Sequence, residues 1–179
     1  MFSYSYMPPR DIKKCSGISL CGLLVGFGMI YCSNFLPYST AFQILGIALL
    51  SIAIFLTTRY VVKKYVYSIQ KAGEGDYDFV VNEVNGKRSV VACRINIDEI
   101  EDFIYSADGK MPGKYSGKTG KAILRYNYCQ DIFPLDAYYL YANIREGRVC
   151  IKFSPDKKLA EIIESLRTKE ILSENKELR

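Results

Sequence analysis

The sequence predicts a membrane-spanning α-helical hairpin followed by a cytoplasmic, mainly-β domain. Two observations support this prediction. The 44 residues from Cys15 through Thr58 contain no Asp, Glu, Lys or Arg, although the chain of 179 residues has 24 basic and 19 acidic ones. After this uncharged run, short segments rich in β-branched and aromatic residues alternate with turn residues, a pattern typical of β-strands.

The uncharged run is long enough for two membrane spans and a tight turn. A helix rises about 1.5 Å per residue, so a hydrocarbon core roughly 30 Å thick requires about 20 apolar residues. We expect the spans at residues 16–36 and 40–58. Pro37 and its polar neighbours favour a turn between them, because they interrupt helical hydrogen bonding. A cleaved signal peptide is the competing interpretation, but no convincing cleavage site is present and a second span follows directly.

Basic residues near the span ends predict the orientation of the hairpin. Lys and Arg accumulate in the cytoplasmic segments of membrane proteins. The turn between the spans has none, whereas both outer ends of the hairpin are basic. The topology-determining residues are Arg10, Lys13 and Lys14 before the first span and Arg59, Lys63 and Lys64 after the second. We therefore expect a multi-pass protein of the cell (cytoplasmic) membrane with both termini in the cytoplasm.

The first span contains a helix-packing pattern. Gly22 and Gly26 form a GxxxG spacing, which lets two helices approach closely. We expect this face to pack against the second span of the same chain. A homodimer contact is the alternative.

The tail is expected to form about seven antiparallel strands closed by one helix. The expected strands are residues 59–69, 77–84, 88–97, 100–105, 121–128, 137–144 and 148–153, and a helical turn is the alternative for residues 100–105. Asn85-Gly86 predicts a tight hairpin turn, because type I′ turns need positive φ at both central residues. Ser154 is expected to cap the closing helix, with Pro155 at its first position.

One strand shows the alternation of a half-buried sheet. In residues 88–97, apolar side chains alternate with the polar Arg94 and Asn96. The expected apolar face consists of Val91, Cys93, Ile95 and Ile97.

Four segments in this order together resemble a pleckstrin-homology-like (PH-like) domain. They are RYVVKKYVYSI, FVVNEVNGKRSVVACRI, NIDEIEDF and IKFSPDKKLAEIIESL. Such domains are found in bacterial membrane proteins behind two or more transmembrane helices. The resemblance implies a binding or scaffolding module. Eukaryotic members often bind phosphoinositides, whereas bacterial ones mostly lack an assigned ligand. The first turn, KAGEGD, does not match the basic signature of the phosphoinositide binders.

Four regions follow from these patterns. Residues 1–15 form a cytoplasmic N-terminal segment and residues 16–58 the transmembrane hairpin. Residues 59–168 form the PH-like domain, and residues 169–179 are a charged C-terminal tail.

A glycine-lysine loop at residues 106–120 nearly matches a nucleotide-binding P-loop. Gly113 and Gly117 are separated by three residues rather than four, Pro112 has no N–H, and the next segment is expected to be a strand. These departures argue against nucleotide hydrolysis. We interpret the loop first as a solvated connection whose lysines keep it soluble, and its functional alternative is a candidate contact with anionic lipid. The residues concerned are Lys110, Lys114, Lys118 and Lys121.

Composition limits the classes of function. The chain has no histidine, which removes the usual Ser-His-Asp and Cys-His arrangements. Its six cysteines form no CxxC pair, and we expect free thiols, no metal and no cofactor. The tail carries 21 basic and 18 acidic residues, too mild an excess to predict a nucleic-acid partner.

We expect a non-catalytic, membrane-anchored interaction or scaffolding module. Its expected partners are the bilayer together with a protein partner, a second copy of the chain or anionic lipid headgroups. The alternative is an accessory or regulatory subunit of a larger membrane transport or assembly complex.

Overall fold

The structure is a computed structural model of the chain. It describes residues 3–9, 12–35, 38–73, 75–111, 124–132, 134, 136–145 and 147–177, with side chains through residue 168. The chain divides into two compact units. One is a helical unit, Arg10–Lys64, and the other is a β unit formed by Met1–Pro9 and Tyr65–Arg179.

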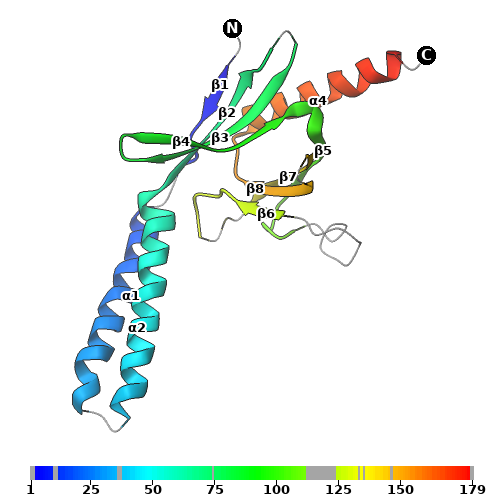
Figure 1. The fold of residues 1–179 in the computed structure, drawn as a ribbon. Coiled ribbons are helices and arrows are strands. Elements are labelled where there is room, and N and C mark those ends of the chain that lie inside the picture. The colour runs from blue at the N-terminus through cyan, green and yellow to red at the C-terminus, as the bar shows by residue number, and fades with distance from the viewer. Residues whose placement is uncertain are drawn as a thin grey trace. The chain divides into compact units, whose positions relative to one another are not determined.

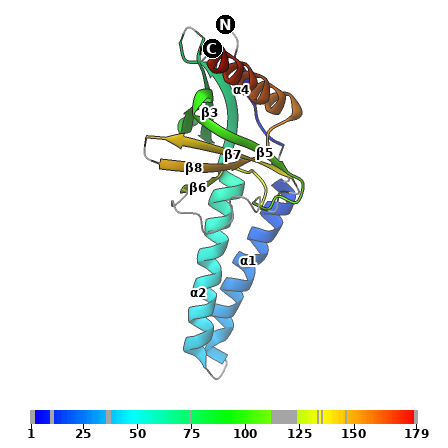
Figure 2. The ribbon, with the colours of Figure 1, turned by 90° about the vertical axis from the view of Figure 1, so that its right-hand side faces the viewer.

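The helical unit consists of two helices that lie side by side (Figures 1 and 2). Its elements are α1 (Ile12–Cys32), a 3₁₀ turn (Ser33–Phe35), α2 (Ser39–Leu56) and a π-helical turn (Thr57–Val62). Ile12–Phe35 and Ser39–Val62 are each 24 residues long, and both are long and apolar enough to cross a membrane. The helices extend beyond the predicted spans into basic flanks, because Lys and Arg are good helix formers.

The β unit contains two four-stranded sheets, of which the first has the strand order β1-β2-β3-β4. Its strands are β1 (Tyr4–Tyr6), β2 (Lys64–Lys71), β3 (Tyr77–Asn85) and β4 (Arg88–Asn96). No strand was predicted before the first helix. β1 nevertheless runs antiparallel to β2, with Ser5 opposite Ser68. β2 begins at Lys64 rather than at residue 59, because the helical conformation continues through Val62.

The second sheet has the strand order β5-β7-β8-β6. Its strands are β5 (Ile100–Ser106), β6 (Leu124–Asn127), β7 (Ala137–Ile144) and β8 (Gly147–Phe153). β6 pairs in parallel with β8, so the prediction that all strands are antiparallel is wrong here. Residues 128–136 separate β6 from β7, and a connection of that length does not force the two strands to pair. β8 therefore takes the place between them.

The turn of the β3–β4 hairpin lies one residue later than predicted. Asn85 pairs with Arg88, so the two turn residues are Gly86 and Lys87. Gly86 has a φ of 60°. Among the described non-glycine residues only Tyr38 has a positive φ, so the turn requires glycine only at its first central position.

A β-bulge ends the apolar face predicted for β4. Val81 pairs with Cys93, whereas the next residue of β3, Asn82, pairs with Val91, which leaves Ala92 as the extra residue. Successive residues of a strand point to opposite faces, and paired residues share a face. Val91 therefore lies on the face opposite to Cys93, and it is 54% exposed. The predicted face continues only from Cys93 onward.

The closing helix α4 (Lys157–Glu177) begins at a different cap than predicted. The Asp156 carboxylate accepts a hydrogen bond from the Leu159 backbone N–H at 3.0 Å. Asp156 is therefore the N-cap residue, and Pro155 precedes the helix. The Ser154 hydroxyl instead donates to the Asp136 carbonyl.

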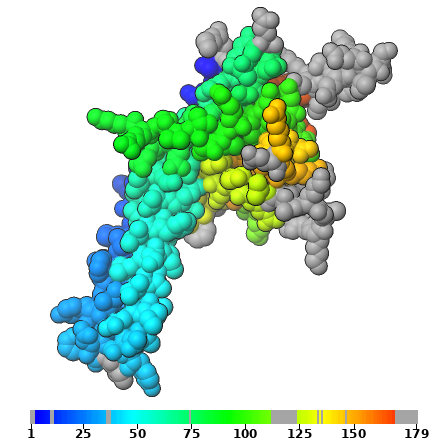
Figure 3. Space-filling model, viewed as in Figure 1, coloured from blue at the N-terminus to red at the C-terminus, as the bar shows by residue number. Residues whose placement is uncertain are grey.

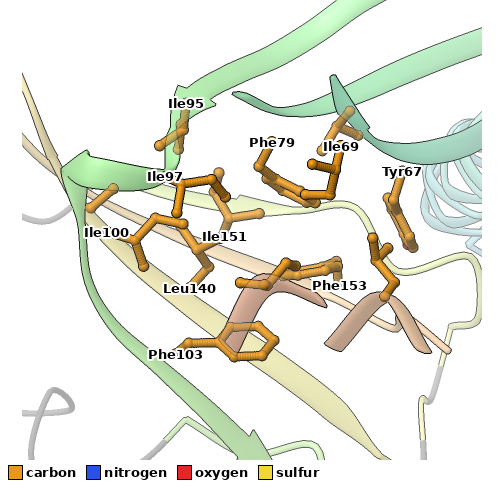
Figure 4. Packing of buried hydrophobic residues seen from close by; sticks show 14 of the residues in the cluster. Tyr67, Ile69, Phe79, Ile95, Ile97, Ile100, Phe103, Leu140, Ile151 and Phe153 are labelled. Carbon is orange, nitrogen blue, oxygen red and sulfur yellow. The ribbon is translucent and has the colours of Figure 1, made fainter. Parts of the chain in front are cut away.

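The core of the β unit lies between the two sheets and α4 (Figure 4). Phe153 lies near its centre, with ring centroids 4.8 Å from Phe79 and 5.2 Å from Tyr67. Leu159 and Ile163 of α4 are fully buried in the same cluster. The cluster also includes Ile69 and Ile95 of the first sheet, Leu140 and Ile151 of the second, and Ile97 of the short 3₁₀ turn Ile97–Glu99 between β4 and β5.

Candidate functional site

The two helices approach each other through small residues. A Cβ atom added to Gly46 would lie 2.7 Å from the Ile30 side chain and 3.0 Å from the Gly26 carbonyl oxygen. A Cβ atom added to Gly22 would lie 3.1 Å from Cβ of Ala53. The predicted glycine pair of α1 thus faces α2 of the same chain. Gly46 is the matching small residue on α2, and it was not predicted from the sequence.

A polar contact between the helices is satisfied internally. The buried Ser19 hydroxyl donates to the Ala53 carbonyl at 3.3 Å and is hydrogen-bonded to the Thr57 hydroxyl. The Thr57 hydroxyl also bonds the Ala53 carbonyl, at 2.8 Å. Such hydrogen bonds satisfy polar side chains within an apolar helix pair and offset the cost of burying them.

The outer surface of the helical unit is apolar. Its most exposed large side chains, each more than half exposed, are Leu20, Leu24, Phe27, Tyr31, Phe35, Tyr38, Ile44, Leu45, Ile47, Ile52, Ile54 and Phe55. Soluble proteins rarely expose a continuous apolar surface of this kind. Such a surface is typical of a membrane-spanning segment or of a contact with another protein.

The basic residues predicted to determine topology lie at the ends of the helical unit that are joined to the β unit by the chain. Those that the structure describes are Lys13, Lys14, Arg59, Lys63 and Lys64. Lys13 and Lys14 are exposed in the first turn of α1, and the Arg59 guanidinium lies over the Tyr60 ring at 5.1 Å. Arg10 lies outside the described residues.

The predicted lysine loop is described only at its start. The Lys110 side chain is 84% exposed, and its ammonium lies 3.8 Å from the Asp108 carboxylate. Lys114, Lys118 and Lys121 lie outside the described residues, and so does the near P-loop match. Their role stays a prediction.

The base of this loop is held by backbone and side-chain hydrogen bonds. One Asp108 carboxylate oxygen accepts from the Lys110 backbone N–H at 3.0 Å and from the Ser106 hydroxyl at 2.8 Å. The bond from the Lys110 N–H, then that from the Ser106 hydroxyl, lowers the pKa of Asp108. The Gly109 carbonyl accepts from the Tyr139 hydroxyl and the Lys152 ammonium. The loop therefore leaves the sheet at a fixed point.

Two adjacent acidic residues of β5 form ion pairs. Glu101 lies 2.8 Å from Arg148, and Asp102 lies 3.4 Å from Arg167 of α4. The two ion pairs connect β5 to β8 and to α4. Within the described part of the chain, His, Cys, Asp and Glu form no group of three or more that could hold a metal ion.

A short segment after β6 connects the two sheets, a role that was not predicted from the sequence. The Tyr128 backbone N–H donates to the backbone carbonyl of Lys152 in β8 at 2.8 Å. The backbone carbonyl of Tyr128 accepts from the Tyr67 hydroxyl of β2, also at 2.8 Å. Its hydroxyl donates to the Ala92 carbonyl at the bulge of β4, at 3.3 Å. Burial raises the pKa of Tyr128. The only signal in the sequence was an alternation of tyrosines at residues 126 and 128.

Comparisons with known protein families, with curated proteins and with solved structures find no match to this chain. A functional assignment therefore depends on the geometry of its two units.

Proposed function

We propose that this protein is a non-catalytic, membrane-anchored interaction module of the cell (cytoplasmic) membrane. The apolar outer surface of α1 and α2 supports the proposal most strongly. In the most apolar stretches of these helices, only 17% and 11% of the residues are buried within the structure. A core helix of a soluble protein is mostly buried, and a surface helix has a polar face. α1 and α2 are neither mostly buried nor polar on one face, and a bilayer provides the apolar surroundings that such helices require.

The pairing of β1 with β2 supports a topology with both termini on one side. β1 precedes α1 and β2 follows α2, yet Tyr6 lies opposite Tyr67 in the same sheet. If the helices span a bilayer, these strands can pair only when the chain returns to the side from which it entered. The basic residues at these ends favour the cytoplasm as that side.

The β unit is proposed to act as a PH-like binding or scaffolding domain. Seven strands, β2 to β8, are followed by a helix that covers the core, which is the order that the resemblance implies. Tyr4–Tyr6 adds an eighth strand to that arrangement. The domain would bind a protein partner or an anionic lipid surface on the cytoplasmic side.

The membrane anchor can be tested by extraction and flotation of the full chain. We expect the chain to remain with membranes after an alkaline carbonate wash and to float with them in a density gradient. Leu24→Arg together with Ile47→Arg should release it, because each charge in the middle of a span costs about 2.5–3.5 kcal/mol. Tyr105→Arg, an exposed position of the β unit, serves as the matched control. Release of the unaltered chain by carbonate would refute the anchor.

The lysine loop can be tested in vesicles that hold the full chain. Acetylation of lysines is compared between neutral and anionic vesicles at low and high salt. A lipid contact predicts that the four loop lysines are protected only in anionic vesicles at low salt, while the exposed Lys71 reacts equally in all. Equal acetylation of the loop lysines in neutral and anionic vesicles would show that the loop is a solvated connection. It would favour a protein, rather than a lipid surface, as the partner of the β unit.

A further inference from the structure

The end of the β3–β4 hairpin exposes apolar and basic side chains together. The hairpin projects from its sheet (Figures 1 and 3), and every residue from 85 to 92 is exposed. Val90 is 65% exposed and Val91 is 54% exposed. Lys87 and Arg88 adjoin these valines at the turn. Within residues 82–92 the one acidic residue is Glu83, which lies opposite Val90 and is partly buried.

Both faces of this projecting end carry an apolar side chain. Val90 pairs with Glu83 and Val91 pairs with Asn82, so the two valines point to opposite faces of the hairpin. A two-stranded hairpin without a covering layer is only marginally stable in water. Two exposed valines beside two cations therefore favour surroundings that are apolar and negatively charged.

The direction of the strands places this turn at the end of the first sheet where β2 begins. Lys63 alone separates Val62, the last helical residue, from the start of β2. β3 returns along β2 after a turn in which the Ala72 N–H bonds the Asp76 carbonyl. Because β3 has nine residues and β2 eight, the hairpin turn lies at the end of the sheet where β2 begins.

We propose that the end of the β3–β4 hairpin is a membrane contact. Val90 and Val91 enter the interfacial layer of an anionic bilayer, and Lys87 and Arg88 bind the phosphate groups of its lipids. This contact rests on the proposed function, because the membrane anchor holds the domain at the bilayer surface. It is distinct from the lysine loop, which leaves the second sheet at Ser106.

A peptide strand is a poorer occupant of this edge. The Ala92 carbonyl already accepts the Tyr128 hydroxyl, and a bulge interrupts the pattern that an added strand would follow. A second copy that paired antiparallel around Val91 would also bring Arg88 opposite Arg94, and like charges in that position are destabilising.

The absence of tryptophan from this chain allows a direct test. Val90→Trp gives a full-length chain with a single tryptophan at the hairpin end, and Tyr105→Trp gives a matched reporter at an exposed site of β5. Each is reconstituted in vesicles of phosphatidylcholine alone or with phosphatidylglycerol. Tryptophan emission is recorded with brominated lipids and with aqueous acrylamide as quenchers.

We expect the Val90→Trp emission to shift to shorter wavelength in anionic vesicles, with quenching by brominated lipid and protection from acrylamide. Adding Lys87→Glu and Arg88→Glu should abolish the shift, and Tyr105→Trp should show none. Acrylamide quenching equal to that of Tyr105→Trp would overturn the contact. Protection from acrylamide without quenching by brominated lipid would also overturn it, in favour of a protein or a second copy.

Flotation of the same vesicles separates the two proposals. A chain that floats and resists carbonate, but whose Val90→Trp reporter stays in water, refutes the hairpin contact alone. A chain that carbonate releases refutes the anchor itself.

Discussion

Tyr6 lies opposite Tyr67 in the β1–β2 ladder, with the two ring centroids 6.5 Å apart, although the whole helical unit separates them in the sequence. The three-residue strand β1 covers one edge of the first sheet. The Tyr4 hydroxyl of this strand donates to Asp156 at the start of α4 at 2.5 Å. The chain before the first helix is therefore part of the β unit, and fragments that start after the helices lack this strand.

Tyr67→Phe tests the connection between the sheets. The substitution removes a hydroxyl that donates to the Tyr128 carbonyl at 2.8 Å, and it leaves that partly buried carbonyl without this donor. We expect the free energy of unfolding to fall by roughly 1–3 kcal/mol. The measurement is denaturant unfolding of the full chain in mild detergent. Tyr105→Phe, at an exposed site, should change nothing, and an equal loss in both variants would contradict the role of Tyr67.

Asp156 has two roles that substitutions can separate. It caps α4 through the Leu159 N–H and accepts the Tyr4 hydroxyl of β1. Asp156→Ala should lower the free energy of unfolding by about 0.5–2 kcal/mol through loss of the cap alone. Asp156→Ser retains a capping hydroxyl and should cost less. If both variants unfold at the same denaturant concentration, the cap contributes nothing.

Gly46→Ala tests the close approach of the helices. The added Cβ atom would lie 2.7 Å from Ile30, so the helices must separate, at a cost of about 1–3 kcal/mol. A Cβ atom added to Gly28 would meet nothing within 4 Å, so Gly28→Ala should be neutral or slightly stabilising. Thermal unfolding in detergent compares the two variants. A neutral Gly46→Ala would show that the helices do not pack as described.

Cys93 should react slowly with alkylating reagents. Burial raises its pKa to about 11, and the thiolate is the reactive form. The neutral thiol is thus favoured in the folded state. Its contribution to stability is complete below the unfolded pKa and is lost as the pH rises through about 11.

Mass spectrometry of iodoacetamide-treated protein measures this reactivity. Ser89→Cys introduces an exposed thiol on the same strand. As the pH is raised, this thiol should become reactive at a lower pH than Cys93 does. Equal rates for the two thiols near pH 8.5 would contradict the burial of Cys93.

The helical unit could be predicted because absence of charge over a long run is a property of composition. The basic flanks followed from the same pattern. The close contact between the helices could be predicted only for α1. Gly22 and Gly26 form a recognisable spacing there, whereas Gly46 is a single glycine in α2. Its importance depends on which side of α2 meets α1, and the sequence does not encode that as a local pattern.

The β unit was predictable in its strands but not in its edges. β1 has three residues, too few for any periodicity, and its pairing depends on residues beyond the helices. The bulge at Ala92 lies in the run Val90–Cys93, where four successive apolar residues show no alternation. The exposed hairpin end follows from that bulge, so it could not be inferred before the register was known.

The most direct test is to measure on which side of the membrane the helical turn and the β unit each lie. In a chain whose six cysteines are replaced by serine, Tyr38→Cys places a thiol beside the turn between the helices, and Tyr105→Cys places one on the β unit. Sealed right-side-out membrane vesicles are treated with a membrane-impermeant maleimide, before and after permeabilisation. A two-span hairpin with a cytoplasmic β unit predicts that Tyr38→Cys is labelled at once and Tyr105→Cys only after permeabilisation. Labelling of both thiols in sealed vesicles, or of neither, would contradict it.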